Sequence, residues 1–399
     1  MNMPLVLLNR RRRGFTAFSP SALFALAEPG VWYDPSDLTT LFTDTAGTTF
    51  VTTPGQTVAL MLDKSKGLTL GSELVTNTGG PFVTTDGWTA QVDATLSINS
   101  GSLRVTNNAA ATKRAYFAFT SVVGKSYVFV ATVTGSGGGV VGGRLTAGTS
   151  LANESLGTTA SAASGPLRLQ FVATGTTTFI QLVNQGTSLG GYAEWASASL
   201  KELAGNHATQ ATAASRPTYQ SSGGRHWLAF DGADDFMVTP TITPGVDKVQ
   251  VFAGVRKLSD AARGTIVEHS ATIASNNGSF HLTAPNAASA TFGFESKGTT
   301  LTDAVATFAA PTTRVVTGIG DIAGDSTIIR ANGTQQDQDT ADQGTGNYLA
   351  YPIYIGRRGG TTLPFNGQIY SMIVRFGANL DAGTITPTET FVNGKTGAF

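Results

Sequence analysis

Cysteine is absent from this chain of 399 residues, and only 13% of its residues are charged. Without cysteine the chain forms no disulfide framework and no thiolate metal site, which fits folding in a reducing cytoplasm. The 26 basic residues balance the 26 acidic ones, so there is no net charge to attract nucleic acid. No apolar run approaches the roughly twenty residues that span a bilayer, so we expect no membrane insertion.

The N-terminus also lacks the order of a secretory signal. It reads MNMPLVLLNRRRR, with a short apolar run before the arginines. A signal places basic residues first and follows them with about seven or more apolar residues. We therefore expect no export by the Sec route.

Glycine is abundant, with 48 copies, and threonine, serine, alanine and valine accompany it. This mixture favours short strands joined by tight turns and disfavours helix bundles. The hydrophobic fraction of 41% is ordinary, and this length allows two or three compact units. The composition therefore predicts an all-β fold with more than one domain.

Runs of strand length recur in two parts of the chain, separated by turn residues. Several alternate apolar with polar residues, as at Tyr127, Phe129 and Ala131, which buries one face of a sheet and leaves the other in water. The pattern predicts two β-sandwich domains. The predicted strands lie within 102–107, 116–123, 126–134, 167–173, 178–183, 227–238, 248–256, 265–269, 279–282, 314–319, 327–330, 353–356 and 368–376.

A small helix is predicted only near the N-terminus, over residues 19–26. Ser19 suits the N-cap position, Pro20 suits the first helical position, and Pro29 with Gly30 ends the helix. From residue 31 onward the pattern is strand and turn to the end of the chain.

The first part resembles the jelly-roll carbohydrate-binding modules that are attached to glycanases and occur in many phage structural proteins. The segments that carry the resemblance, in order, are ELVTNTGGPFVTTDGW, LSINSGSLRVTN, AFTSVVGKSYVFVATV and AEWASASLKEL. The resemblance covers about a third of the chain, and it implies a jelly roll that binds glycan.

The second part resembles the laminin-G-type lectin sandwiches of the concanavalin A-like class, through LAFDGADDF and PFNGQIYSMIV. Residues 31–66 and 205–219 resemble two segments that form one continuous stretch in phage proteins of this lectin-like type. We therefore expect an insertion, since chain ends that lie close together make one inexpensive. The rival organisation is a string of three units. The expected divisions are 1–30 as an N-terminal arm, 31–67 and 204–399 as one lectin-like sandwich, and 68–203 as the inserted jelly roll.

These resemblances imply a bacteriophage structural protein on the virion surface, in a tail fibre, baseplate or head fibre, that binds host-surface carbohydrate. It would fold and assemble in the bacterial host cytoplasm. Arg10, Arg11, Arg12 and Arg13 would anchor the arm to other virion proteins, and the chain would form a homo-oligomer such as a trimer. One alternative is a purely structural decoration protein without a ligand. Another is an accessory module of a secreted enzyme, which would need an export signal.

No catalytic constellation is visible in the sequence, so we expect no enzyme and no cofactor. The histidines His207, His226, His269 and His281 have no metal-ligand spacing, and Glu268 and Glu295 are each expected to be isolated. Aspartates gather in two groups that turn and cap hydrogen bonds explain, with structural calcium as the alternative. The groups are Asp34, Asp37, Asp44 and Asp63, and Asp231, Asp234 and Asp235.

Sugar recognition combines aromatic faces with planar hydrogen-bonding side chains. In the jelly roll the candidates are Tyr116, Phe117, Gln181, Tyr192 and Glu194, while Trp88 and Trp195 are expected to pack in the core. In the lectin-like part the candidates are Tyr348 and Tyr351, which the pattern places in a loop. For each aromatic the alternative is a core or interface position.

Overall fold

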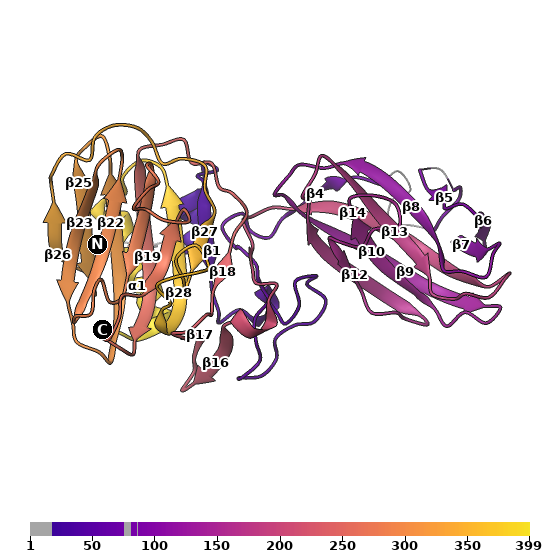
Figure 1. Cartoon of the computed structure of the whole chain (residues 1–399), viewed down its shortest axis with the longest axis horizontal. Coiled ribbons are helices and arrows are strands. Elements are labelled where there is room, and N and C mark those ends of the chain that lie inside the picture. The colour runs from indigo at the N-terminus through magenta and orange to yellow at the C-terminus, as the bar shows by residue number, and fades with distance from the viewer. Residues whose placement is uncertain (1–17, 76–80, 86) are drawn as a thin grey trace, which may run out of the picture.

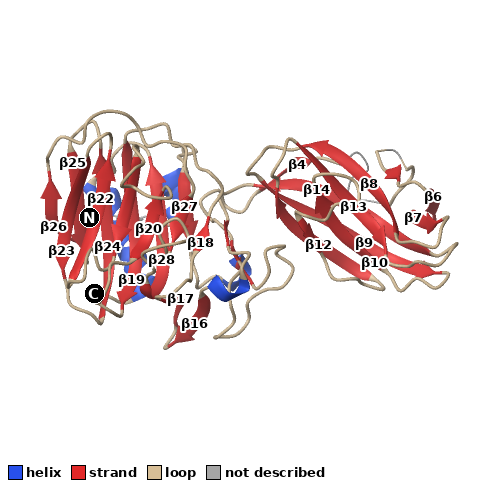
Figure 2. Cartoon of the chain, in the orientation of Figure 1, coloured by secondary structure: helices blue, strands red, loops and turns tan. Residues whose placement is uncertain are grey.

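The computed structural model describes residues 18–75, 81–85 and 87–399. These residues form four antiparallel sheets, which make two bodies (Figures 1 and 2). The prediction of an all-β, sandwich-like fold is confirmed. Of the helices within the described residues, none is long and apolar enough to cross a membrane.

The smaller body is built from two sheets that enclose one apolar core. Trp88 and Trp195 lie in this core with Phe129, as the sequence predicts. The five-stranded sheet has the order β11–β10–β13–β8–β5. Its strands are β5 (Thr89–Ala90), β8 (Lys113–Thr120), β10 (Gly143–Gly148), β11 (Gly157–Thr158) and β13 (Thr177–Asn184). The six-stranded sheet contains β4 (Leu70–Glu73), β6 (Ala94–Asn99), β7 (Ser102–Asn107), β9 (Ser126–Gly137), β12 (Gly165–Val172) and β14 (Tyr192–Leu203).

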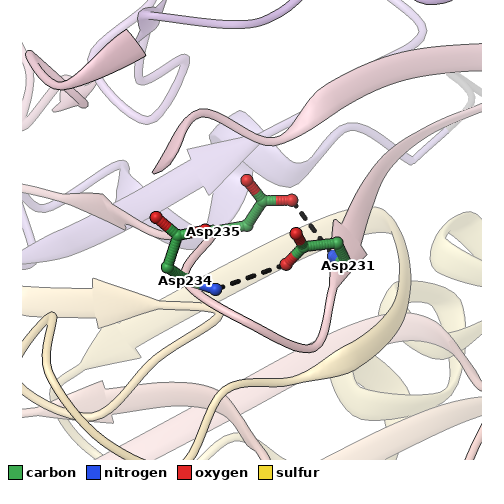
Figure 3. A group of neighbouring side chains, drawn as sticks. All are labelled: Asp231, Asp234 and Asp235. Atoms are coloured by element: carbon green, nitrogen blue, oxygen red, sulfur yellow. Dashed lines mark hydrogen bonds between the residues drawn. The ribbon is translucent and has the colours of Figure 1, made fainter. Parts of the chain in front are cut away.

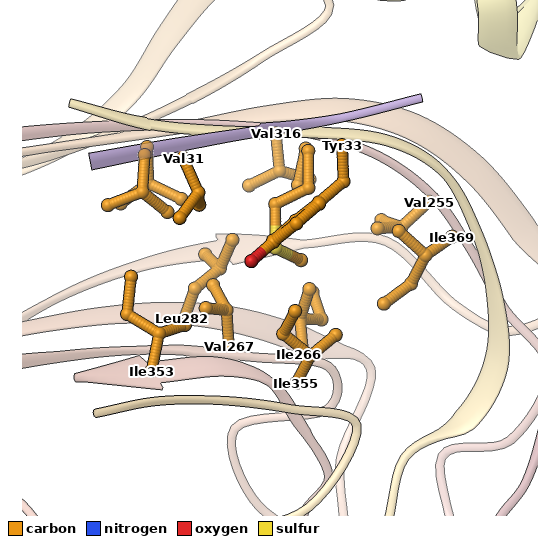
Figure 4. Packing of buried hydrophobic residues seen from close by; sticks show 14 of the residues in the cluster. Val31, Tyr33, Val255, Ile266, Val267, Leu282, Val316, Ile353, Ile355 and Ile369 are labelled. Carbon is orange, nitrogen blue, oxygen red and sulfur yellow. The ribbon is translucent and has the colours of Figure 1, made fainter. Parts of the chain in front are cut away.

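The larger body also has two sheets, and their inner faces interlock through aliphatic side chains such as Val31, Val316, Leu282 and Ile353 (Figure 4). The eight-stranded sheet contains β1 (Gly30–Tyr33), β16 (Thr218–Ser222), β17 (Arg225–Asp231), β19 (Lys248–Lys257), β24 (Thr312–Asp321), β25 (Ser326–Ala331), β26 (Thr334–Asp339) and β28 (Asn366–Phe376). The nine-stranded sheet contains β2 (Leu41–Phe42), β3 (Leu60–Met61), β15 (Ala208–Thr209), β18 (Met237–Val238), β20 (Thr265–His269), β21 (Ser279–Thr283), β22 (Thr291–Lys297), β23 (Leu301–Thr307) and β27 (Ile353–Ile355).

Strands from both ends of the chain share the sheets of the larger body. β1 pairs with β28, and β3 lies between β2 and β15. Strands β4 to β14 pair only with one another in the smaller body. These pairings are the ones that an inserted domain requires, and the division of the chain after residues 67 and 203 stays our interpretation of them.

The buried carboxylate of Asp63 links the two segments through which the chain leaves the larger body and returns to it. Asp63 is fully buried, and its oxygens accept hydrogen bonds from the backbone N–H groups of Trp32, Ser65 and Asn206, each at 2.8 Å. The Ser65 hydroxyl donates a fourth, and the Asp63 N–H donates to Nδ1 of His207 at 2.9 Å. Burial raises the pKa of the Asp63 carboxyl above its usual value, although the four donors oppose the shift.

The two bodies also touch through apolar side chains. Phe42, Leu60 and Leu62 of the larger body pack against Val128 and Leu203 of the smaller one. Such a cluster restricts how the bodies move against each other, because separating them would return its apolar surface to water.

The predicted N-terminal helix is confirmed as a short 3-10 helix, η1 (Pro20–Phe24). The other 3-10 helices are η2 (Leu38–Thr40) and η3 (Ala213–Ser215). Leu23 and Phe24 pack on the outer face of the eight-stranded sheet, so this part of the arm lies against the body. The predicted anchoring residues Arg10, Arg11, Arg12 and Arg13 lie outside the described residues.

The expectation of strand and turn up to the end of the chain is wrong, because α1 (Ala382–Thr396) follows β28. Its sequence, AGTITPTETFVNGKT, is poor in helix-forming residues and contains Pro387. The ends supply the stability: Asp381 accepts from the Thr384 N–H at 2.8 Å, and Gly397 adopts the left-handed conformation. Val392 packs on the same sheet face as η1, so tertiary contacts override the weak propensity.

Replacing Asp63 should destabilise the larger body. In Asp63→Asn one oxygen becomes an NH2 group that cannot accept from Ser65 and Asn206, which leaves buried donors unpaired. We expect a loss of roughly 2–4 kcal/mol in the free energy of unfolding, measured by urea denaturation. The exposed Asp342→Asn is the matched control and should change it by less than about 0.5 kcal/mol. Equal stability of the two variants would contradict the role of Asp63.

Candidate functional site

Two of the predicted sugar-binding residues lie side by side on the outer face of the five-stranded sheet. Gln181 on β13 is directly opposite Tyr116 on β8 and Thr146 on β10. Thr89 and Thr158 extend this line to the sheet edges, and we call the five residues the Gln181 row. The row faces away from the core because the alternate residues on the same strands are buried in it.

The loop of residues 149–156 lies over part of the Gln181 row. The Ala152 N–H donates to Oε1 of Gln181 at 2.9 Å, and Nε2 of Gln181 donates to the Asn153 carbonyl at 2.7 Å. Arg114 also donates to Oε1 of Gln181, at 3.2 Å. These contacts leave Gln181 with no exposed surface, while Tyr116 stays half-buried and packs against Phe179 with ring centroids 6.0 Å apart.

Two arginines beside the row share one carboxylate. Arg144 forms a bidentate pair with Glu154, with N to O distances of 2.6 and 2.7 Å. Arg114 lies 3.5 Å from the same carboxylate, and burial lowers the pKa of the Arg114 guanidinium. The face therefore combines two aromatic rings, an amide and two guanidinium groups.

Phe117 does not belong to this face, so its assignment to a sugar platform is wrong. It follows Tyr116 on β8, and successive side chains on a strand point to opposite faces. Phe117 points inward, where its ring lies 6.0 Å from that of Trp88.

Tyr192 and Glu194 lie on the outer face of the other sheet of the smaller body. Arg104 on β7 stacks on the Tyr192 ring at 3.9 Å and pairs with Glu194 at 2.7 Å. Asn99 donates to the same carboxylate. Arg104 contacts both residues, so the three side chains form a polar cluster that lies on a different sheet from the Gln181 row. The candidate residues that were predicted to form one platform therefore lie on two separate faces.

The prediction that Tyr348 presents its ring in an exposed loop is wrong. The side chain is fully buried in the core of the larger body, its hydroxyl lies 2.7 Å from that of Ser296, and burial raises its pKa. Tyr351 is half-buried, with its ring edge on to His269 at 5.6 Å. The spacing of Tyr348 and Tyr351 in a loop-like stretch does not indicate which of the two rings is buried in the core.

A charged line crosses the nine-stranded sheet, and sequence reasoning missed it. Glu268, His281 and Glu295 are opposite one another on β20, β21 and β22, and Asp303 on β23 continues the line. His281 Nδ1 lies 3.0 Å from Glu295, and its Nε2 lies 3.7 Å from Glu268. The expectation that these glutamates are isolated is therefore wrong, because strand pairing brings together residues that are distant in sequence.

Each glutamate of this line also has an arginine partner. Arg358 lies 2.9 Å from Glu268, and Arg263 lies 2.6 Å from Glu295. Burial alone would raise the pKa of Glu295, but His281 and Arg263 hold it at about 2. A general acid at neutral pH needs a raised pKa, so Glu295 is poorly suited to that role. The arrangement fits a buried ion network.

Three aspartates meet at the turn after β17 (Figure 3). One carboxylate oxygen from each of Asp231, Asp234 and Asp235 lies within 4.8 Å of the others. Asp231 accepts from the Ala233 N–H at 2.8 Å, and Asp235 accepts from the Asp231 N–H at 3.0 Å. These bonds fit turn chemistry, whereas calcium takes six to eight oxygens. Burial and the two neighbouring charges raise the pKa of Asp235 to about 7.

The other four aspartates are held by lysines or by backbone N–H groups, and Asp34 and Asp37 share Lys64. Asp34 pairs with Lys395 at 2.9 Å, and Asp37 pairs with Lys64 at 2.6 Å. Asp44 accepts from the N–H groups of its own turn. Capping and pairing account for these residues, and Asp63 belongs to the junction described above.

No protein-family model and no curated protein matches this chain. Among solved structures, it is similar to the CBM40 module of a Ruminococcus gnavus sialidase bound to α2,3-sialyllactose, with 20% identity over 36% of this chain and 82% of that one, and a TM-score of 0.29. The botulinum neurotoxin serotype D binding domain is 12% identical over 42% of each chain, with a TM-score of 0.33. A Limulus polyphemus pentraxin is 12% identical over 40% of this chain and 78% of its own, with a TM-score of 0.33. Likenesses this remote assign no function to the chain.

The raised pKa of Asp235 should make stability depend on pH. In the unfolded chain this carboxyl loses its proton near pH 4, whereas in the folded chain it keeps the proton up to about pH 7. Stability should therefore fall as the pH rises from 4 to 7. Asp235→Asn carries no such proton, so we expect its melting temperature to exceed that of the wild type by roughly 2–4 °C at pH 8 and to match it near pH 4.

Thermal unfolding at both pH values measures this effect, with Asp342→Asn as the control. A wild type and an Asp235→Asn variant with parallel pH profiles would contradict it. Calcium ions at pH 8 should leave the wild-type melting temperature unchanged, and a rise that Asp235→Asn abolishes would favour the calcium alternative.

Proposed function

We propose that this chain is a non-enzymatic surface protein of a bacteriophage particle, and that it binds host-surface glycan on the five-stranded sheet of its smaller body. One observation carries the proposal: the Gln181 row places the half-buried Tyr116 beside a planar amide on the outer face of one sheet, where a short loop covers the amide. Two of the predicted residues meet there through strand register.

The chemistry of the face suits a sugar. The rings of Tyr116 and Phe179 offer apolar surface for the C–H face of a pyranose. Arg144 offers a planar donor at the edge of that surface, and Gln181 and Arg114 would add theirs once the loop of residues 149–156 is displaced; such donors fix the orientation of hydroxyl groups.

The location on a particle rests on the sequence resemblances and on the N-terminal arm. The described part of the arm lies against the larger body, where Leu23 and Phe24 of η1 pack on the sheet. The arginines that precede it would contact neighbouring virion proteins, and a homo-oligomer such as a trimer would present several glycan-binding faces together.

The second candidate function is a purely structural virion protein without a ligand. The observation that favours it is the cover over the row, since the loop of residues 149–156 leaves Gln181 fully buried. In that case the row would serve only to hold the loop.

Glycan binding should depend on the aromatic pair. On an array of bacterial surface polysaccharides, we expect Tyr116→Ala and Phe179→Ala to weaken binding by about tenfold or more, because stacking is lost. Tyr192→Ala is the matched control on the other sheet and should bind like the wild type. Binding that survives Tyr116→Ala would place the glycan elsewhere, and an array that stays blank would favour the structural alternative.

The particle location has its own test. Electron microscopy of phage particles labelled with antibody to this chain should show label at the tail tip or at fibres. Label spread evenly over the capsid would favour the decoration protein.

A further inference from the structure

Two guanidinium groups lie beside the Gln181 row, but only one carboxylate in the described part of the chain pairs with them. Among the described residues, Arg114 and Arg144 form ion pairs only with Glu154. Arg144 takes both oxygens of that carboxylate at 2.6 and 2.7 Å, whereas Arg114 approaches one oxygen at 3.5 Å. The face therefore carries one positive charge more than it neutralises.

Among the polar side-chain atoms of Arg114, Arg144, Thr146 and Gln181, two are buried without a hydrogen-bond partner among the described residues. They are Nε of Arg114, whose side chain is about nine-tenths buried, and Oγ1 of Thr146, which is opposite Gln181 in the row. An unpaired buried donor costs free energy of about 1–3 kcal/mol. An unpaired buried polar atom can mark a place where a ligand supplies the missing hydrogen bond. Here the Arg114 guanidinium lies beside the Glu154 carboxylate, and Thr146 lies beside the Gln181 amide.

The loop that carries Glu154 is held mainly by these same polar groups. Gln181 binds it through the Ala152 N–H and the Asn153 carbonyl, and Arg144 binds Glu154. Ala152 adopts a left-handed backbone with φ of 64°, which costs a non-glycine residue about 1 kcal/mol. Only Leu156, at the end of the loop, packs against the core. A competing group with the same chemistry would therefore release the loop without disturbing the sandwich.

We propose that Arg114 and Arg144 form a binding site for the carboxylate of an acidic sugar, and that Glu154 occupies it as a ligand mimic from the chain itself. The bidentate contact of Arg144 is the geometry in which a guanidinium binds any planar carboxylate. A uronic-acid residue would replace Glu154 on the two arginines, take the Gln181 amide from the loop, and stack its ring on Tyr116. This inference rests on the proposed glycan-binding function and names its ligand class.

The test compares Glu154→Gln with the wild type by calorimetric titration of D-glucuronate into the full chain, with D-glucose as the neutral probe. Removing the internal carboxylate should raise the affinity for glucuronate by about tenfold or more and leave the affinity for glucose unchanged. Glu154→Gln combined with Arg144→Gln should lose the gain. Glu202→Gln, on the same body and paired with the exposed Lys125, is the matched control and should behave like the wild type.

Hydrogen exchange in the wild type tests the displacement without any substitution. The Ala152 amide, which Gln181 now holds, should exchange faster in saturating glucuronate but not in glucose. Unchanged glucuronate affinity in a folded Glu154→Gln variant, a gain that survives Arg144→Gln, or unchanged exchange at Ala152 would each overturn the proposal. Stronger binding of glucose 6-sulfate than of glucuronate would overturn the carboxylate assignment.

The outcomes also separate this inference from the proposed function. If Tyr116→Ala abolishes binding to array glycans while Glu154→Gln changes nothing, glycan binding stands and the acidic-sugar site fails. If Glu154→Gln gains affinity for glucuronate while no array glycan binds, the arginine site stands and the proposed binding of host-surface glycan fails.

Discussion

The carboxylate of Asp63 fixes the point where the chain leaves the larger body and returns to it. Its oxygens bind Trp32 on β1, Ser65 on the outgoing passage and Asn206 on the returning one. Taking a charge out of water is costly, and hydrogen bonds to the ionised form offset that cost. Because β1 and β15 both belong to the larger body, its two sheets close around one core only if these passages stay together. The smaller body can then vary without disturbing that core.

The outer sheet faces differ in how they are covered, and this difference selects the candidate site. Helix α1 and η1 cover the eight-stranded sheet with apolar side chains, and Val392 contacts it directly. The nine-stranded sheet carries the network around His281, whose glutamates are both paired with arginines. On the five-stranded sheet the cover is a short polar loop, and unpaired atoms of Arg114 and Thr146 remain beneath it. Unpaired atoms also occur in the network on the nine-stranded sheet, at Arg263 and Asp303, so the five-stranded sheet is distinguished by a cover that is a short loop held through polar contacts.

The local alternation of apolar and polar residues was enough to predict the strands and their buried faces. It does not predict which residues become neighbours when distant strands pair. The alternation at Tyr127, Phe129 and Ala131 reports a buried face, and the structure places all three in the core. The same alternation makes the Phe117 side chain point to the opposite face of the sheet from Tyr116. Selecting candidates by residue type alone ignores this alternation. Pairing between distant strands decides which residues meet, so no local pattern indicates that Glu268 lies beside His281. Helix α1 was missed because its caps and packing outweigh its composition.

An internal ligand mimic sets a threshold for binding, and the threshold has a consequence for a protein displayed in several copies. If the loop of residues 149–156 is open in about 1% of molecules, the apparent dissociation constant of one site rises about a hundredfold. A single acidic sugar would then bind weakly, while several faces engaging one polymer would recover the loss through effective concentration. Under the proposed function, Glu154 would thus favour dense polyanionic host surfaces over free sugar acids. Rebinding of a released sugar would be slow, because Glu154 is covalently tethered and returns to Arg144 as soon as the sugar leaves.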